Sequence, residues 1–183
     1  MLSFRGKFLE SVVAGISVLP ATAILVAGVL MISPATASTC DPSERLEDRI
    51  KRHEGVRNCV YNDQFGNPTI GVGHLLKKPV QEVLCWRKDK INAALAHDID
   101  RAQNGAKHDF GKGWHLQPLI VQDVLTDMAF NLGSSGLARF NRFLSLVRSG
   151  RYQDAADDLL TTKYARQVPN RVNELACLLR SAK

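Results

Sequence analysis

The chain changes from a helical to an extended pattern between residues 46 and 72, and this change limits the folds that it can adopt. Side chains that recur four and then three residues apart define one face of a helix: Leu46, Ile50 and His53. Residues 41–44 read Asp-Pro-Ser-Glu, an N-cap aspartate followed by a proline at the first helical position and a glutamate at the third. We therefore predict that a helix begins there. Gly55 suits the left-handed conformation that ends a helix, so Glu54 should be its last residue.

Two short extended runs follow, at residues 59–61 and 69–72, and turn formers separate them. This pattern predicts an antiparallel β-hairpin. Side chains of its second strand should alternate between two faces, with Ile70 and Val72 on one of them. The other face should carry only Thr69, Gly71 and Gly73. Because glycine has no side chain, we expect this face to be nearly bare backbone that a flat ligand such as a sugar ring can approach.

Three polar side chains of this stretch are candidates for one catalytic site: Glu54, Asp63 and Thr69. They belong to the helix end, the turn and the second strand, so they could converge on one cleft. The negative end of a helix dipole disfavours a second negative charge, which favours a carboxyl group that keeps its proton near neutral pH. Glu54 is therefore a candidate general acid. The alternative is that all three are ordinary surface residues, since carboxylates are usually solvated.

The residues around these three resemble the signature of the phage-type lysozymes, glycoside hydrolase family 24. The resemblance lies in Glu-Gly at 54–55, Tyr-x-Asp at 61–63 and Gly-x-x-Thr-Ile-Gly-x-Gly-His-Leu at 66–75. Both spacings match the catalytic glutamate, aspartate and threonine of that family. Ala-Phe-Asn-Leu-Gly at 129–133 and Gln-Val-Pro-Asn-Arg at 167–171 extend the resemblance through the C-terminal half of the chain.

The resemblance implies a mostly helical α+β fold of the lysozyme type, with a small antiparallel β-hairpin or sheet lobe and a C-terminal helical lobe. It also implies a monomeric endolysin, a muramidase that hydrolyses the β-1,4 bond between N-acetylmuramic acid and N-acetylglucosamine in peptidoglycan and so lyses a host cell. The precedent of the family favours inversion at the reacting carbon. Two alternatives stay open: a noncatalytic peptidoglycan-binding or membrane-interaction protein on a lysozyme scaffold, and a lytic transglycosylase.

The resemblance also assigns residues outside the catalytic three. Arg171 corresponds to the arginine that pairs with the catalytic glutamate in relatives, although the sequence alone allows an exposed arginine in the first turn of a helix. Asn131 is expected either to reach the cleft or to cap a helix end. With Gly71 and Gly73, these residues form the candidate substrate-binding set. Tyr164 stands where relatives commonly have a tryptophan, a departure that concerns substrate contacts and not the chemistry.

Apolar residues at helical spacing predict a helical lobe after the hairpin. A helix over residues 88–102 should link two lobes, and a glycine-rich loop should follow at residues 105–113. Pro118 should open a strong helix that ends at Gly133 and has one apolar face: Val121, Val124, Leu125, Met128 and Leu132. Further helices are expected over residues 137–147 and 152–160 and from residue 169 onward.

Residues 1–39 differ in composition from residues 40–183, which we expect to form the lysozyme-like catalytic domain. Residues 11–40 carry no charge and are numerous enough to span a bilayer. They are either a signal peptide that is cleaved after Ala37 or an uncleaved transmembrane helix within residues 12–32. The resemblance favours the second, because some phage-type lysozymes carry an Ala- and Gly-rich signal-anchor-release segment. Such an enzyme is exported, tethered to the inner membrane and later released into the periplasm; the alternative is a soluble periplasmic protein.

Export would allow the four cysteines to form disulfides, because disulfides persist outside the cytoplasm. Cys40, Cys59, Cys85 and Cys177 allow three pairings that the sequence alone cannot separate. A bond between Cys40 and Cys59 could hold the first helix against the hairpin. The resemblance favours a bond between Cys85 and Cys177, because membrane-released relatives have cysteines in comparable places. Buried free thiols are the alternative to any disulfide.

Charge and composition argue against several other functions. The formal net charge of +6 makes the surface modestly basic, which suits an anionic cell wall or membrane. The sequence has neither a basic helix interleaved with aromatic residues nor a phosphate-binding glycine loop, so nucleic acid is not an expected partner. Its five histidines show no metal-binding spacing. We therefore expect neither a metal nor a cofactor.

Overall fold

A computed structural model describes residues 40–63, 65–76 and 84–183. The transmembrane helix expected within residues 12–32 lies outside these residues. None of the helices that the structure does describe combines the length and the apolar character that crossing a bilayer requires.

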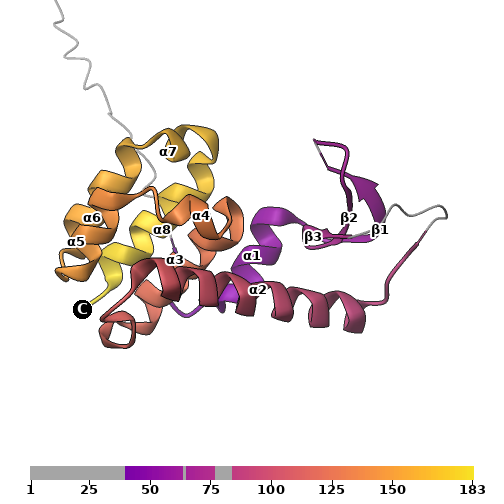
Figure 1. The fold of residues 1–183 in the computed structure, drawn as a ribbon, viewed down its shortest axis with the longest axis horizontal. Helices are drawn as coiled ribbons and strands as arrows, with labels where there is room; N and C mark the ends of the chain where they lie inside the picture. Colours follow the sequence, from indigo (N-terminus) through magenta and orange to yellow (C-terminus); the bar gives the residue numbers. More distant parts are fainter. Residues whose placement is uncertain (1–39, 64, 77–83) are drawn as a thin grey trace, which may run out of the picture. The chain divides into compact units, whose positions relative to one another are not determined.

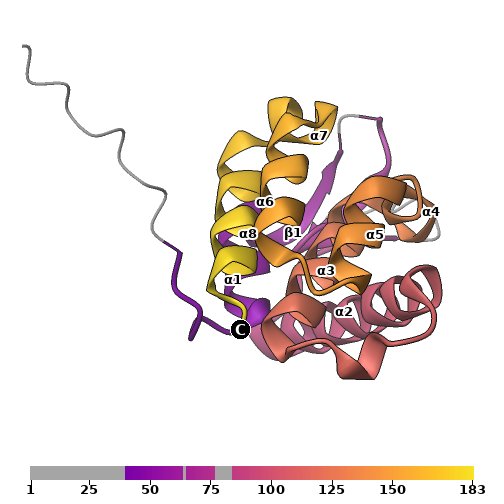
Figure 2. The ribbon, with the colours of Figure 1, turned by 90° about the vertical axis from the view of Figure 1, so that its left-hand side faces the viewer.

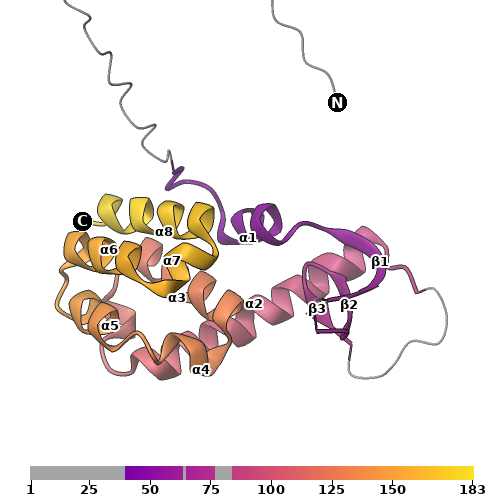
Figure 3. The same ribbon diagram turned by 90° about the horizontal axis from the view of Figure 1, so that it is seen from above.

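The described chain is mostly helical with one small sheet, as the sequence predicts (Figure 1). The first part contains α1 (Leu46–Glu54), β1 (Arg57–Asn62), β2 (Pro68–Gly71), β3 (His74–Leu75) and α2 (Lys88–Phe110). The second part contains the 3-10 helix η1 (Trp114–Leu116), α3 (Leu119–Leu132), α4 (Ser134–Leu137), α5 (Asn141–Arg148), α6 (Tyr152–Thr161), α7 (Lys163–Gln167) and α8 (Pro169–Ser181). Figures 2 and 3 show α6 and α8 side by side in this second, helical lobe.

The main hydrophobic core lies among α3, α5, α6, α8 and the end of α2. The apolar face predicted for α3 is confirmed, since four of its residues have no exposed surface: Val121, Val124, Leu125 and Met128. Burying an aliphatic side chain of this size contributes about 1.5 to 3 kcal/mol. A second, smaller core joins the sheet to α1 and to the first half of α2, and its buried members are Ile50, Val72, Ile91 and Leu95.

Helix α2 connects the two lobes, as predicted, but it is longer than the sequence indicates (Figure 1). It has 23 residues and passes through Gly105, where a loop was expected. The physical reason is tertiary packing: Ala106 and Phe110 follow the glycine and are 0% and 1% exposed in the main core. Burying them outweighs the cost of about 1 kcal/mol that glycine imposes on a helix interior. The chain leaves the helix only at Gly111, with φ of 77°.

The start of α1 also differs from the prediction, which was wrong by several residues. The helix begins at Leu46, and residues 41–44 form a turn instead. The Asp41 carboxylate accepts hydrogen bonds from the backbone N–H and the hydroxyl of Ser43, at 2.8 and 2.6 Å. Such local hydrogen bonds compete with helix formation, so a sequence that resembles a helix cap folds as a turn. The predicted end is confirmed, because Glu54 is the last helical residue and Gly55 has φ of 76°.

The predicted hairpin is part of a three-stranded antiparallel sheet in the order β1-β2-β3. In the ladder Tyr61 lies opposite Thr69, and Thr69 lies opposite Leu75. The expected bare face does not form in full. Thr69 is only 2% exposed, and a Cβ atom added to Gly71 would lie 3.3 Å from Cγ2 of Ile91 in α2. A Cβ atom added to Gly73 would meet no other atom within 4 Å, so of the two glycines on this face only Gly73 is open.

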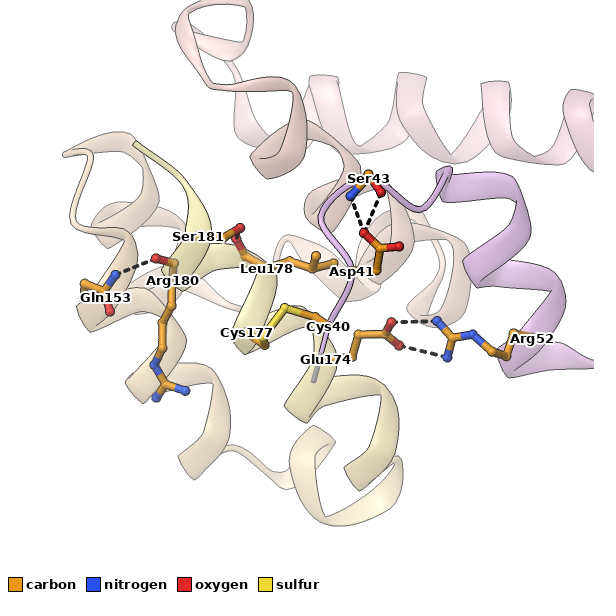
Figure 4. Close-up of a disulfide and its surroundings, with 10 residues drawn as sticks. All are labelled: Cys40, Asp41, Ser43, Arg52, Gln153, Glu174, Cys177, Leu178, Arg180 and Ser181. Carbon is orange, nitrogen blue, oxygen red and sulfur yellow. Dashed lines mark hydrogen bonds and ion pairs between the residues drawn. A yellow bond between two sulfur atoms is a disulfide. The ribbon is translucent and has the colours of Figure 1, made fainter. Parts of the chain in front are cut away.

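Two disulfides join the cysteines, so the free-thiol interpretation is wrong. Cys40 pairs with Cys177 and Cys59 pairs with Cys85, which overturns both the favoured Cys85–Cys177 bond and the Cys40–Cys59 alternative. Cys59 and Cys85 are antiparallel bridge partners, because the chain after the sheet returns along β1. In Figure 4 the Cys40–Cys177 bond ties the segment before α1 to α8.

The two glycines of the sheet give a matched test of packing. Both Gly71 and Gly73 have positive φ, of 70° and 73°, so alanine at either position costs about 1 to 2 kcal/mol of stability. G71A should lower the free energy of unfolding by about 1 to 3 kcal/mol more than G73A, because the added methyl group would lie too close to the side chain of Ile91. Denaturant unfolding of the two variants measures the difference, and equal losses would contradict the placement of Gly71 against α2.

Candidate active site

Glu54 lies at the end of α1 and contacts residues of two other helices. Its Oε1 atom accepts a hydrogen bond from Nη1 of Arg171 in α8 at 2.6 Å. The Nδ2 group of Asn131 in α3 donates to the same oxygen at 3.4 Å. The side chain of Glu54 remains 25% exposed. The structure thus brings together three residues that sequence analysis singled out, and it leaves the Glu54 side chain partly exposed to solvent.

Arg171 is buried, with 4% of its surface exposed, so the interpretation as an exposed first-turn arginine is wrong. Its Nε group donates a hydrogen bond to Oδ1 of Asp127 at 2.7 Å. Burial by itself lowers the pKa of an arginine, but the carboxylates of Asp127 and Glu54 outweigh it and raise the pKa of Arg171. The guanidinium therefore stays charged and is held from two sides.

The contact continues into the core through Arg49 and Asp127, two residues that were not predicted from the sequence. Arg49 of α1 and Asp127 of α3 are both fully buried, and Nε of Arg49 donates to Oδ2 of Asp127 at 3.3 Å. The available signal was a single aspartate within the apolar run Val-Leu-Thr-Asp-Met-Ala at residues 124–129. A carboxylate in such a position has to be paired with a cation or a donor, because burying it alone is very costly.

Asp63 lies in the turn after β1, where backbone and side-chain donors hold its carboxylate. Oδ1 accepts from the backbone N–H groups of Phe65 and Asn67, both at 2.8 Å, and Oδ2 accepts from Nδ2 of Asn67 at 3.0 Å. The side-chain and backbone hydrogen bonds from Asn67 are the main reason that the pKa of Asp63 lies below its usual value. Asp63 is thus a fixed carboxylate that stays ionised at neutral pH.

Thr69 is held through the same neighbour as Asp63. Its hydroxyl donates a hydrogen bond to the backbone oxygen of Asn67 at 3.1 Å, which leaves the oxygen lone pairs of the hydroxyl as acceptors. Asn67 therefore orients both candidate residues of the hairpin, a role that sequence analysis did not assign. The only indication of this role in the sequence was the place of Asn67 among the turn-forming residues.

The two candidate substrate-binding glycines lie in different surroundings. Gly71 is buried against α2, whereas Gly73 lines a cavity of about 420 Å³ between the sheet and the helices. Leu75, Phe130 and Asp98 also line this cavity. The carboxylate of Asp98 is 2.6 Å from Nδ1 of His74, which fixes the end of the sheet to α2.

A second polar cluster lies on the other side of the α1 end. Glu174 of α8 is 7% exposed and accepts hydrogen bonds from both Nη groups of Arg52, at 2.6 and 3.2 Å (Figure 4). Nε2 of His53 lies 2.6 Å from the second carboxylate oxygen of Glu174. Arg52 also donates to Glu44 at 2.6 Å. These contacts fix the helical turn that carries Glu54.

The structure has a carboxyl group next to a buried cation at the end of α1 and an ionised carboxylate in the turn after β1, which are the two kinds of group that acid–base chemistry at a glycosidic bond requires. Among the described residues, no hydrogen bond joins Glu54 to Asp63 or to Thr69. Within residues 40–63, 65–76 and 84–183, no three His, Cys, Asp or Glu side chains are placed to hold a metal ion.

Comparison with known proteins gives one family. Residues 51–180 match phage lysozyme. The endolysin of Salmonella phage P22 is 32% identical over 127 residues, which is 67% of this chain and 83% of that protein. Probable T4-type lysozyme 2 of Dictyostelium discoideum is 24% identical over 153 residues, 71% of this chain and 90% of that protein. The pre-baseplate central spike protein of Enterobacteria phage T4 is 28% identical over 142 residues, 63% of this chain but only 24% of that longer protein.

The contacts of Glu174 predict a pH-dependent contribution to stability. Burial raises the pKa of Glu174, but the hydrogen bonds from Arg52 and His53 outweigh it, so the pKa lies below the usual 4.5. The stabilisation is therefore complete above about pH 4.5 and is lost as the pH falls through the lowered value. E174Q should lower the free energy of unfolding by about 1 to 3 kcal/mol at pH 7.

Chemical denaturation at pH 7 and pH 3 measures this effect, and the gap between E174Q and the wild type should narrow at the lower pH. E44Q is the matched control, because Glu44 pairs with the same arginine but has a more exposed side chain, at 22% against 9%. A larger loss in E44Q than in E174Q would contradict the assignment.

Proposed function

Because this chain belongs to the phage lysozyme family, we propose that it cleaves peptidoglycan with Glu54 as the general acid and with Asp63 and Thr69 positioning the attacking water. The protein is an endolysin-like glycoside hydrolase, and the bond it cleaves joins N-acetylmuramic acid to N-acetylglucosamine. The observation that carries the residue assignment is the partly exposed side chain of Glu54, whose Oε1 atom accepts a hydrogen bond from the buried Arg171 at 2.6 Å.

Glu54 donates its proton to the oxygen that leaves with the departing sugar. The group has one oxygen bound to Arg171 and Asn131, which fixes its orientation. Its other oxygen has no hydrogen-bond partner among the residues of the described chain, and we assign the catalytic proton to it. Arg171 then stabilises the carboxylate that remains after the transfer.

Asp63 acts on the opposite face of the sugar. Its three hydrogen bonds keep it ionised, so it can accept a proton from a water molecule. The Thr69 hydroxyl donates to Asn67 and keeps its lone pairs for that water. Attack by water opposite the leaving group inverts the configuration of the reacting carbon, and it requires carboxyl groups about 6.5 to 9.5 Å apart. Gly73, Asn131 and the cavity beside Phe130 contribute to binding of the sugar chain.

We also propose that the protein is exported through the inner membrane by an uncleaved signal anchor within residues 12–32, and that it acts in the periplasm after release. Two observations support this proposal. Residues 11–40 carry no charge. The four cysteines form two disulfides, which persist in an oxidising compartment such as the periplasm.

Substitution of the acid tests the mechanism. E54Q should lower the lytic rate on purified cell walls by about 10² to 10⁴-fold, because glutamine keeps the size of the side chain but has no transferable proton. E47Q is the control: Glu47 lies on the same helix, forms a salt bridge to Lys51 and has the same side-chain exposure of 25%. Release of new reducing ends is the measurement, with thermal unfolding to confirm that both variants fold.

Wild-type rates in E54Q would contradict the assignment of the acid, as would an equal loss in E47Q. D63N should also lower the release of reducing ends. A noncatalytic wall-binding protein would release none with or without this substitution, so the variant separates hydrolysis from simple binding.

The anchor proposal predicts the mass of the active protein. Enzyme recovered from the periplasm in released, lytic form should retain Met1, since a signal anchor leaves the membrane intact. Intact-protein mass spectrometry under non-reducing conditions measures this. A protein that starts at Ser38 would instead establish cleavage after Ala37 and contradict the uncleaved anchor.

A further inference from the structure

Four ionisable side chains form a continuous chain from the protein interior to the surface. Arg49 is fully buried and binds one oxygen of Asp127, which is also fully buried. The other oxygen of Asp127 binds Nε of Arg171 at 2.7 Å, and Nη1 of Arg171 binds Glu54 at 2.6 Å. Only the last member, Glu54, has a substantially exposed side chain. The charges of Arg49, Asp127 and Arg171 alternate in sign, and Glu54 ends the chain.

Among the described residues, Asp127 is the only one that contacts both arginines. Within the described parts of the chain, Nη1 and Nη2 of Arg49 and Nη2 of Arg171 have no hydrogen-bond partner. Asp127 is therefore the only carboxylate that Arg49 contacts there, and one of two that Arg171 contacts. Removal of one partner from a buried ion pair leaves an uncompensated charge, whose effect is felt by the remaining partners.

We propose that Asp127 is a positioning residue for the proposed acid Glu54, acting through Arg171. Asp127 does two things in this arrangement. It binds the Nε edge of the guanidinium, which leaves Nη1 directed at Glu54. It also offsets part of the charge of Arg171, so that this cation orients Glu54 without drawing off the proton that Glu54 transfers to the substrate. This inference rests on the proposed function, in which Glu54 has to carry that proton.

The other groups near Glu54 that the structure describes differ from Asp127, because none of them hydrogen-bonds to both Arg171 and a buried residue of the core. His53 precedes Glu54 on α1 and contacts Glu174, and Asn131 of α3 is neutral. Tyr164 of α7 is 4% exposed, and its burial raises its pKa, so its phenol stays neutral. Asp123 lies one helical turn before Asp127. Burial raises the pKa of Asp123, the charge of Arg49 acts in the opposite direction, and the charge of Asp127 raises the pKa further.

The test is the pH dependence of peptidoglycan cleavage by the full chain. In D127N the charge of Arg171 is no longer offset, so Glu54 should lose its proton at lower pH. The basic limb of the pH–rate profile should then move down by about one pH unit, which lowers the rate above that limb about tenfold. R49M should move the limb in the opposite direction, because Asp127 then offsets Arg171 alone.

D123N is the control on the same helix: Asp123 interacts electrostatically with Arg49 and Asp127 but forms no salt bridge with Arg171, so its shift should be smaller than that of D127N. Opposite shifts in D127N and R49M support the proposal. Shifts in the same direction, or none in folded protein, overturn it, because a purely structural role lowers the rate without moving the limb. If D127N does not fold, R49M provides the test: an upward shift of the basic limb supports the proposal, and a downward shift or none overturns it.

A direct titration separates this proposal from the proposed function. Carbon NMR of the labelled Glu54 carboxyl group in wild type, D127N and R49M reports its proton loss in the absence of substrate. The same opposite shifts are expected there. If Glu54 titrates identically in the wild type and both variants, the role of Asp127 is overturned even though the enzyme is active. If instead the wild type forms no new reducing ends, the proposed function is overturned, and the titration result still stands.

Discussion

The ion pair between Arg171 and Glu54 is the contact on which the arrangement of this protein depends. Arg171 belongs to α8, Glu54 ends α1, and the buried Asp127 of α3 holds the other edge of the guanidinium. One arginine thus fixes three helices that are far apart in the sequence. Because the cation is 4% exposed, its burial is offset by the buried carboxylate of Asp127 and by the hydrogen bond to Glu54. The end of α1, from which the chain enters the sheet, is thereby anchored to the helical lobe.

The proposed acid and the proposed water-binding groups are held by separate means. Glu54 is fixed by long-range contacts with the helical lobe. Asp63 and Thr69 are fixed locally, through hydrogen bonds with Asn67 in a turn of the sheet. The disulfide from Cys59 to Cys85 encloses this turn and the strands around it. Contacts with the helical core therefore position the carboxyl group of Glu54, whereas hydrogen bonds within a turn position that of Asp63.

Local features of the fold could be predicted from the sequence, and long-range ones could not. The end of α1 at Glu54 and the hairpin follow from periodicity and turn residues, which act over a few positions. The turn at Asp41 was missed because a side-chain hydrogen bond competes with a helix cap. Helix α2 passes through Gly105 because of packing that a local pattern does not contain. The partner of Cys85 and the pairing of Asp127 depend on residues distant in sequence.

The central claim is that this chain hydrolyses the glycan strand with water positioned by Asp63. Mass spectrometry of the sugar products from purified peptidoglycan tests it most directly. We predict fragments that end in N-acetylmuramic acid with a free reducing end, into which one oxygen atom from labelled water is incorporated. Fragments that end in the anhydro sugar and contain no label would contradict the claim, because a lytic transglycosylase forms them without using water.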